Sequence, residues 1–357
     1  MSPNILIVRL SAVGDAVHGL PVLCALRDSF PRARLTWVVE ERAAAVVRDH
    51  AALDRLITVP RGWLRNPVAV LRLRRELRRV RPEIALDLQG LTKSAMVAWL
   101  SGAGLRIGFA RPEGRELSRV LNNRLITTSA THVVDRYLEL LGPLGIARPS
   151  VRFDLPRHAE DEATVARYIR ERGLGSGFAV INPGAGWPSK RWPVERLAAV
   201  ARHLGQRRHL PTVVAWGGKE EWALADRIIT TSAGAAHMAP QTTLGELAEL
   251  ARRARLFVSA DTGPLHIAAA VGTPCVGLFG PMPAERNGPY GEQHIALQNA
   301  RLEGSSRSRR TASDDSMRAI SVEEVGSACN QILDRQLADR PVEVFTSTIR
   351  FPSATAA

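Results

Sequence analysis

The stretch of residues 256–272, LFVSADTGPLHIAAAVG, most constrains what this chain can fold into. Its first apolar residues predict a short strand buried in a parallel sheet, and the apolar residues that follow Gly263 predict a helix. The turn of Asp261, Thr262 and Gly263 then lies between the carboxyl end of a strand and the amino end of a helix. Open α/β sheets bind their ligands at this edge. The stretch therefore predicts both an α/β fold and the place of a site.

This turn has two interpretations. In the functional one, the free N–H groups and the dipole of the helix amino terminus hold an anion such as a phosphate, and His266 on the first turn faces it. In the structural one, Asp261 only caps the helix and His266 belongs to the core. The stretch by itself leaves both interpretations open.

Strands and helices alternate at similar spacing along most of the chain, which is typical of βαβ units around parallel sheets. Strands are predicted at 5–10, 35–39, 56–59, 84–88, 106–109, 178–182, 211–216, 256–259 and 275–279. Helices are predicted at 16–30, 42–48, 68–80, 91–100, 133–144, 159–172, 194–204, 220–230 and 244–253. The fold class is therefore α/β, with two Rossmann-like halves.

A stretch with two prolines, 146–158, predicts a linker between these halves. We predict an N-terminal domain over 1–155, a C-terminal domain over 156–320 with a polar surface loop at 303–318, a terminal helix over 321–335 and a disordered tail over 336–357. Two such domains that face each other across a cleft suit a nucleotide-bearing donor on one side and an acceptor on the other. The loop SAVGD after the first strand lacks the G-x-G-x-x-G pattern, which argues against a redox dinucleotide enzyme.

The formal net charge of +13 indicates an acidic partner, such as nucleic acid, an anionic membrane surface or a phosphorylated substrate. The basic stretch 61–79 either holds an acidic acceptor or its membrane, or is a solvated helix face. Its only aromatic residue is Trp63, which disfavours nucleic-acid stacking. Three widely spaced cysteines predict a reducing compartment without a disulfide or zinc site. We expect a cytoplasmic protein, because no signal peptide or membrane-spanning stretch is evident.

A carboxylate follows the first predicted strand. Asp15 faces the cleft and is placed to take a proton from a sugar hydroxyl, although it also suits a helix cap. Gly14 beside it permits a tight turn or the close approach of a substrate.

A glycine-rich basic loop, GAGWPSKRWP (184–193), follows a strand of the second half. Backbone N–H groups at Gly184 and Gly186 and the ammonium group of Lys190 suit a diphosphate, the alternative being a solvated basic loop. In the next turn, WGGKEE, Glu220 is a candidate for binding ribose hydroxyls, and a plain acid at a helix start is the alternative.

Together these motifs resemble glycosyltransferase family 9, the ADP-heptose:lipopolysaccharide heptosyltransferases. The matches cover most of residues 4–335 in the order of the family: RLSAVGDAVHGLP (9–21), WVVEE (37–41), DLQGLTKSA (87–95), HVVDRYLELL (132–141), PSKRWP (188–193) and SADTGPLHIAAAVGTPCVGLFGP (259–281). WVVEE and DLQGLTKSA are more similar to the first heptosyltransferase, which acts on the Kdo residues of lipid A, than to the second.

The resemblance implies a glycosyltransferase B fold, ADP-heptose held mainly by the C-terminal domain, and inversion at the anomeric carbon without a metal or other cofactor. It implies Asp15 as the base and Lys190 as a diphosphate ligand, with further donor contacts at Gly184, Gly186, Glu220, Asp261, Thr262, Gly263 and His266. Acceptor contacts are expected at Gly14, Arg61, Arg65, Gln89, Lys93, His132 and Arg136. We expect a monomer at the inner face of the cytoplasmic membrane, with an anionic glycolipid acceptor and no nucleic acid.

The chain departs from the family pattern in two places. Some heptosyltransferases place threonine hydroxyls in the phosphate loop, whereas Gly184, Ala185 and Gly186 offer only backbone donors. Serines and arginines at 303–318 stand where many members have a cysteine cluster. Two alternatives stay open: a family 9 enzyme with another acceptor, such as a later core sugar or a protein, and a basic binding module without turnover.

Overall fold

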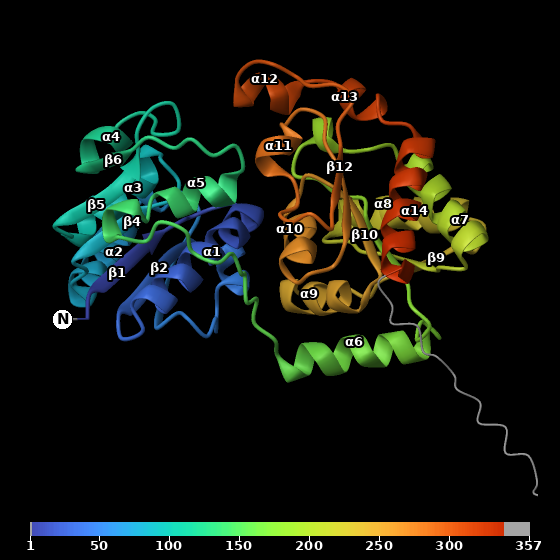
Figure 1. The fold of residues 1–357 in the computed structure, drawn as a ribbon, viewed down its shortest axis with the longest axis horizontal. Helices are drawn as coiled ribbons and strands as arrows, with labels where there is room; N and C mark the ends of the chain where they lie inside the picture. The colour runs from blue at the N-terminus through green and yellow to red at the C-terminus, as the bar shows by residue number, and fades with distance from the viewer. Residues whose placement is uncertain (1, 339–357) are drawn as a thin grey trace, which may run out of the picture.

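The computed structural model describes residues 2–338, which form two α/β domains side by side (Figure 1). Each domain is built on a six-stranded sheet, and every strand pair is parallel. Parallel sheets need helices on both faces, which is why their central strands are nearly all apolar. The predicted α/β class with two Rossmann-like halves is confirmed.

The first sheet has the strand order β3-β2-β1-β4-β5-β6. Its strands are β1 (Asn4–Val8), β2 (Arg34–Glu40), β3 (Arg55–Val59), β4 (Ile84–Asp87), β5 (Leu105–Phe109) and β6 (Arg124–Ile126). Its helices are α1 (Val13–Ser29), α2 (Pro67–Val80), α3 (Thr92–Ser101), α4 (Ser118–Leu121) and α5 (Val133–Glu139), with 3-10 turns at η1 (Glu41–Val46), η2 (Trp63–Arg65) and η3 (Gly142–Leu144). Alternate residues of β1 face opposite layers: Ile5 and Ile7 pack with α1, and Leu6 and Val8 pack with α2 and α3.

The second sheet has the order β12-β11-β10-β7-β8-β9. Its strands are β7 (Ala179–Asn182), β8 (Thr212–Val214), β9 (Ala236–Met238), β10 (Leu256–Ala260), β11 (Cys275–Leu278) and β12 (Ile295–Leu297). Its helices are α7 (Val194–Arg208), α8 (Lys219–Thr231), α9 (Leu244–Arg253), α10 (Gly263–Ala270), α11 (Ala284–Asn287), α12 (Ser306–Thr311), α13 (Asp315–Arg318) and α14 (Val322–Ala338), with a 3-10 turn at η4 (Pro188–Lys190). The central strand β10 is buried at every residue.

Residues 145–158 connect the domains without a helix or strand and lead into α6 (Ala159–Glu171), which packs along α9 beneath the second domain (Figure 1). The connection is tied to the first domain, because Arg152 forms an ion pair with Asp28 of α1. The domains also touch directly, through α1 against α10 and η1 against α9. The carboxyl edge of each sheet faces the space between them.

Several expectations about element boundaries were wrong. Helix α1 starts at Val13 rather than 16 and runs through Pro21, so that Asp15 lies in its first turn and not in a loop. Strands β6, β9 and β12 were missed because each is an edge strand of only three residues, which is too few to show a period. The polar stretch 303–318 contains α12 and α13. Helix α14 continues to Ala338, three residues past the predicted helix end, and the rest of the predicted tail lies outside the described residues.

Candidate active site

A cleft of about 500 Å³ opens between the two sheets. Both domains line it: Arg9, Gly14 and Asp15 come from the first strand and helix of the N-terminal domain, and Gly186, Lys190 and Asp261 come from loops of the C-terminal domain. Because the loops at the carboxyl edges of both sheets meet here, the cleft occupies the position at which open α/β sheets bind ligands.

Asp15 is the carboxylate on the N-terminal side of this cleft. One of its oxygens accepts the Ala12 N–H at 2.9 Å, so that it caps the start of α1, and the other lies 2.5 Å from Nη2 of Arg9. The side chain nevertheless stays 38% exposed toward the cleft. Burial opposes the charge of the Arg9 guanidinium, but the Asp15 carboxylate beside it raises the pKa of Arg9. Asp15 thus caps the helix and also presents a carboxylate to the cleft.

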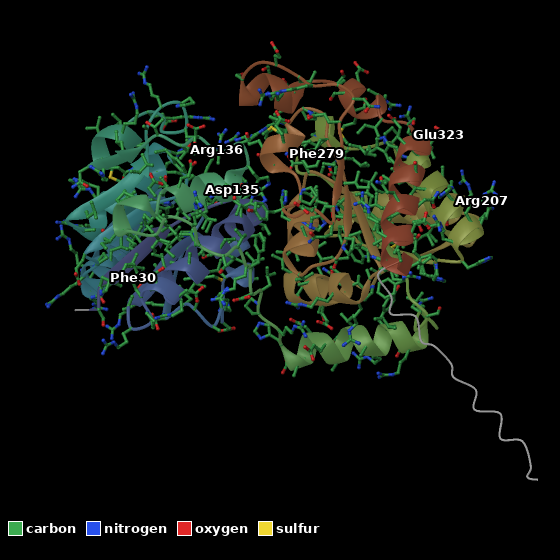
Figure 2. The ribbon with its side chains drawn as sticks, in the orientation of Figure 1. Phe30, Asp135, Arg136, Arg207, Phe279 and Glu323 are labelled. Carbon is green, nitrogen blue, oxygen red and sulfur yellow. The ribbon has the colours of Figure 1, made fainter. Side chains whose placement is uncertain are left out.

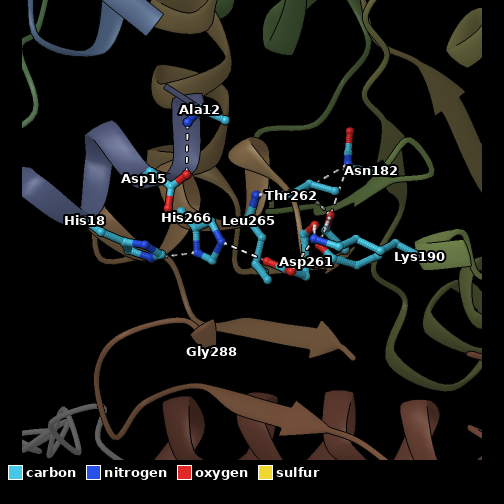
Figure 3. A network of polar contacts seen from close by, with 12 residues as sticks. Ala12, Asp15, His18, Asn182, Lys190, Asp261, Thr262, Leu265, His266 and Gly288 are labelled. Carbon is cyan, nitrogen blue, oxygen red and sulfur yellow. Dashed lines mark hydrogen bonds and ion pairs between the residues drawn. The ribbon is translucent and has the colours of Figure 1, made fainter. Parts of the chain in front are cut away.

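A chain of polar contacts runs from the N-terminal domain into the C-terminal loops (Figure 3). Nε2 of His18 lies 3.1 Å from Nδ1 of His266, and Nε2 of His266 lies 3.2 Å from Oδ1 of Asp261. The Lys190 ammonium lies 2.5 Å from Oδ2 of Asp261. An ionised carboxylate only accepts, so a neutral His266 donates from Nε2 and accepts from His18 at Nδ1. The chain therefore sets one tautomer for each imidazole.

Two pKa shifts determine which groups in this chain of contacts are charged. Burial alone would raise the pKa of Asp261, but the hydrogen bond from His266 and the charge of Lys190 outweigh it and lower that pKa to about 2. Burial, followed by the neighbouring His266 and His132, holds the pKa of His18 well below its usual value. Asp261 is thus a permanent anion paired with Lys190, and His18 is a neutral donor whose Nδ1 has no partner among the described residues.

Helix α10 begins at the turn of Asp261, Thr262 and Gly263. Thr262, not Asp261, is its N-cap, with its hydroxyl 3.4 Å from the Leu265 N–H. Gly263 lies against the side chain of Val13, and a Cβ at Gly14 would come within 2.5 Å of the His266 ring. The two turns approach closely because neither glycine carries a side chain.

The other expected donor residues are placed differently from one another. Gly186 lines the cleft, whereas the space beside Gly184 is filled by the carboxylate of Glu221. Glu220 is 79% exposed, pairs with Arg191 and does not line the cleft. Its neighbour Glu221 accepts the Gly217 N–H at 2.7 Å, so the structure brings Glu221 rather than Glu220 toward the glycine loop.

The expected acceptor residues divide into three groups. Gly14, Gln89 and Arg136 line the cleft. Lys93 and His132 lie near it but already have partners, since Lys93 contacts Glu40 and Ser11 and His132 contacts the Gly288 carbonyl. Arg61 and Arg65 are exposed and do not line the cleft.

Sequence reasoning missed many residues of the cleft, among them Arg9 and His18 described above. Arg115, Trp187, Arg286 and Arg310 line it, and the Trp187 ring packs against both Lys190 and Arg310. Burial lowers the pKa of Arg286, and its Nε has no partner among the described residues. Arg136, which lies on α5 beside Asp135 (Figure 2), also lines the cleft but is paired there with Glu113. No pattern marks Arg115 or Arg286 in the sequence, because Arg115 lies in an irregular segment before α4 and Arg286 lies within the four-residue helix α11.

Two general properties of the described chain bear on this site. Within residues 2–338, no helix has both the length and the apolar character needed to cross a bilayer. The same residues contain no group of three or more His, Cys, Asp or Glu side chains arranged as metal ligands.

Comparison with known proteins identifies the family. The sequence model of glycosyltransferase family 9 (heptosyltransferase) matches residues 70–316. The chain belongs to glycosyltransferase family 9. It is 30% identical over 306 residues to lipopolysaccharide heptosyltransferase 1 of Pseudomonas aeruginosa, a match that covers 82% of this chain and 83% of that protein. The Salmonella typhimurium lipopolysaccharide heptosyltransferase 1 is 28% identical over 306 residues, covering 82% of this chain and 93% of the relative.

Solved structures of this family share the fold. A family 9 glycosyltransferase from Veillonella parvula superposes with a TM-score of 0.80 at 24% identity and covers 94% of this chain and 98% of that one. The Escherichia coli heptosyltransferase WaaC with ADP gives a TM-score of 0.70 at 23% identity, with the same coverage of both chains. The predicted glycosyltransferase B fold is confirmed, and the chain is a glycosyltransferase of the heptosyltransferase family that is similar to lipopolysaccharide heptosyltransferase 1.

Proposed function

We propose that this enzyme transfers heptose from ADP-L-glycero-D-manno-heptose to the Kdo-lipid A inner core, with inversion and without a metal ion. One observation carries the proposal: a single cleft holds the Asp15 carboxylate from one domain opposite the Lys190–Asp261 pair from the other. That arrangement supplies a base for an acceptor hydroxyl and a cation for a leaving diphosphate. The relatives named as lipopolysaccharide heptosyltransferase 1 supply the substrate class.

In the proposed reaction, Asp15 takes the proton of the acceptor hydroxyl as its oxygen attacks the anomeric carbon of the heptose. Arg9 holds the carboxylate in place from behind, and capping of α1 fixes its second oxygen. A base positioned in this way is worth roughly 10²–10⁴-fold in rate. The bond to the β-phosphate breaks on the opposite side of the anomeric carbon, which gives inversion.

The leaving ADP develops negative charge on its β-phosphate, where Lys190 and the amino terminus of α10 would stabilise it. Lys190 is paired with Asp261 in the free protein, so donor binding requires the ammonium to turn from the carboxylate toward the diphosphate. His266 keeps its hydrogen bond to Asp261 during this exchange and offsets part of the lost stabilisation. Arg286, whose Nε has no partner among the described residues, and Arg115 in the same cleft suit an acidic acceptor, whereas Arg136 is already paired with Glu113.

The test is transfer from ADP-heptose to Kdo-lipid A, followed by mass spectrometry of the glycolipid, with other nucleotide sugars as donors and with EDTA in a parallel reaction. We expect product with ADP-heptose alone and no loss with EDTA. If product forms only on a glycolipid that already carries one heptose, that glycolipid replaces Kdo-lipid A as the proposed acceptor. Absence of product on every acceptor, together with no protection of the fold by ADP, would reject the proposal and favour a binding module without turnover.

A further inference from the structure

The outer helical layer of the N-terminal domain combines exposed apolar side chains with arginines. Nine large apolar side chains are exposed in residues 2–338, and seven of them lie on this layer, its edge strand or the adjoining turn: Leu64, Val68, Leu71, Trp99, Leu117, Val120 and Leu125. Helix α2 packs on α3, and α3 packs on α4, so these helices form one layer. The solvent side of this layer comprises residues 61–81, Trp99, α4 and Leu125. We call it the α2–α4 face.

Helix α2 has a buried apolar stripe and, outside that stripe, exposed apolar residues. Its buried residues Leu73, Leu77 and Val80 recur at the spacing of one helix face and pack on the sheet. Val68 and Leu71 lie outside this stripe and are 68% and 59% exposed. The two domains meet through α1 and η1 on one side and α9 and α10 on the other. The apolar residues of the α2–α4 face are therefore not accounted for by the core or by packing between the domains.

The arginines of this face lack partners in the described structure. Eight arginines fall between residues 61 and 81, and none of their side chains forms an ion pair or hydrogen bond within residues 2–338: Arg61, Arg65, Arg72, Arg74, Arg75, Arg78, Arg79 and Arg81. The only acidic residue in the same stretch is Glu76. Arg74, Arg75, Arg78, Arg79 and Arg81 also line a surface groove together with Leu71. Such a groove suits an anionic head group beside an acyl chain.

We propose that the α2–α4 face docks on an anionic lipid bilayer. Stable attachment of a peripheral protein to a membrane takes two signals, and this face has both: a polybasic groove and apolar side chains able to enter the interface. Nucleic acid would use the arginines, but it would leave Leu71, Trp99 and Val120 without a role, and stacking aromatics are nearly absent. Charge and apolar area on one face therefore favour a bilayer over nucleic acid.

The position of this face also fits the site. Helix α2 follows β3, so its amino end, with Leu64 and Val68 nearby, lies at the carboxyl edge of the first sheet, the edge at which Asp15 faces the cleft. A bilayer against this face would bring a lipid-anchored acceptor toward the N-terminal side of the cleft. This geometric consequence rests on the proposed function, whereas the docking itself does not.

The experiment is flotation of the full chain with vesicles of phosphatidylcholine alone or with phosphatidylglycerol added. The variant Arg74→Glu/Arg75→Glu/Arg79→Glu reverses three groove arginines that lie outside the active-site cleft. The control Arg167→Glu/Arg170→Glu/Arg207→Glu reverses three exposed arginines of the second domain and has the same net charge. A third variant, Leu71→Ser/Trp99→Ser, is compared with the wild type in high salt, where charge attraction is screened.

We expect the wild type and the control to float with anionic vesicles only, and the groove variant to bind at least about 100-fold more weakly. The serine variant is expected to lose the binding that survives in high salt. Protection by ADP in a thermal shift should be unchanged in all variants, which shows that each is folded. Equal flotation with neutral vesicles, equal losses in the groove variant and its control, or capture of an oligonucleotide instead of vesicles would each overturn the proposal. These vesicles contain no acceptor, so failed docking and failed transfer give separate results.

Discussion

Replacing Asp261 with asparagine tests the electrostatic account of the donor side. In the folded chain the pKa of this carboxyl is about 2, below its ordinary value of 3.8, because the contributions of His266 and Lys190 exceed the effect of burial. A difference of nearly two units, at about 1.4 kcal/mol for each unit, makes the ionised carboxylate worth ~2 kcal/mol of stability. Asp261→Asn should therefore lower the free energy of unfolding by about this amount at pH 7.

The pH dependence of this stability difference follows from the direction of the pKa shift of Asp261. A carboxyl whose folded pKa is lowered contributes its full stability above the unfolded pKa and loses it as pH falls through the folded pKa. The difference between wild type and Asp261→Asn should hold from pH 7 to about pH 5, fall to ~1 kcal/mol near pH 3 and nearly vanish around pH 2. Urea unfolding at each pH, followed by far-ultraviolet circular dichroism, measures this difference directly.

A matched control is Asp334→Asn, which breaks an exposed ion pair with Arg208 on the same domain. Exposed pairs contribute little, so this variant should unfold like the wild type at pH 7. If Asp261→Asn is equally destabilising at pH 7 and pH 3, the loss comes from packing or hydrogen bonding and not from charge. That result would refute the pairing of Lys190, Asp261 and His266 as the cause of the low pKa.

Three further predictions concern the cleft. Asp15→Asn should reduce the rate of transfer by roughly 10²–10⁴-fold while ADP affinity, measured by calorimetry, stays unchanged; an unaltered rate would leave Asp15 only its capping role. Gly14→Ala places a Cβ 2.5 Å from the His266 ring, so we expect about 1–3 kcal/mol of destabilisation and a loss of transfer. The control Gly142→Ala adds a Cβ where there is open space and should leave stability unchanged. Equal stability of the two variants would contradict the close contact. Lys190→Met should weaken ADP binding by about 10–100-fold but leave adenosine binding unchanged, because only ADP carries the diphosphate; an equal loss for both ligands would place Lys190 elsewhere.

Much of the fold was predictable because its strands are apolar runs that end in turn residues. Strand β10 and the turn after it are typical: a buried strand that is apolar except for Ser259, then a capping threonine and a glycine at the helix start. The missed strands β6, β9 and β12 lie toward the outside of each sheet and take their strand conformation from pairing with a neighbour, which single-sequence patterns do not contain. The start of α1 was placed too late because the capping group, Asp15, follows the helix start by two residues.

The candidate site was only partly predictable, because residues that lie far apart in the sequence meet there. Turn chemistry identified Asp15, Lys190 and Asp261 one by one, yet their arrangement depends on contacts such as His18 to His266, 248 residues apart. Arg286 was missed because an arginine in a four-residue helix has no local signature, and only its half-buried position in the cleft marks it as a site residue. Glu220 and Glu221 are adjacent in sequence, and only the fold shows which of them turns toward the glycine loop.

The contact between the turns at Gly14 and Gly263 has a consequence for the distance between the two sides of the cleft. Because neither glycine carries a side chain, the two turns pack closely beside the cleft, with Gly263 against Val13 and Gly14 against the ring of His266. A Cβ at either position would press on these neighbours, so glycine at both positions permits this close approach of the two domains. The separation between Asp15 and the C-terminal loops opposite it therefore depends on a contact between two backbones and not on the rotamer of a long side chain.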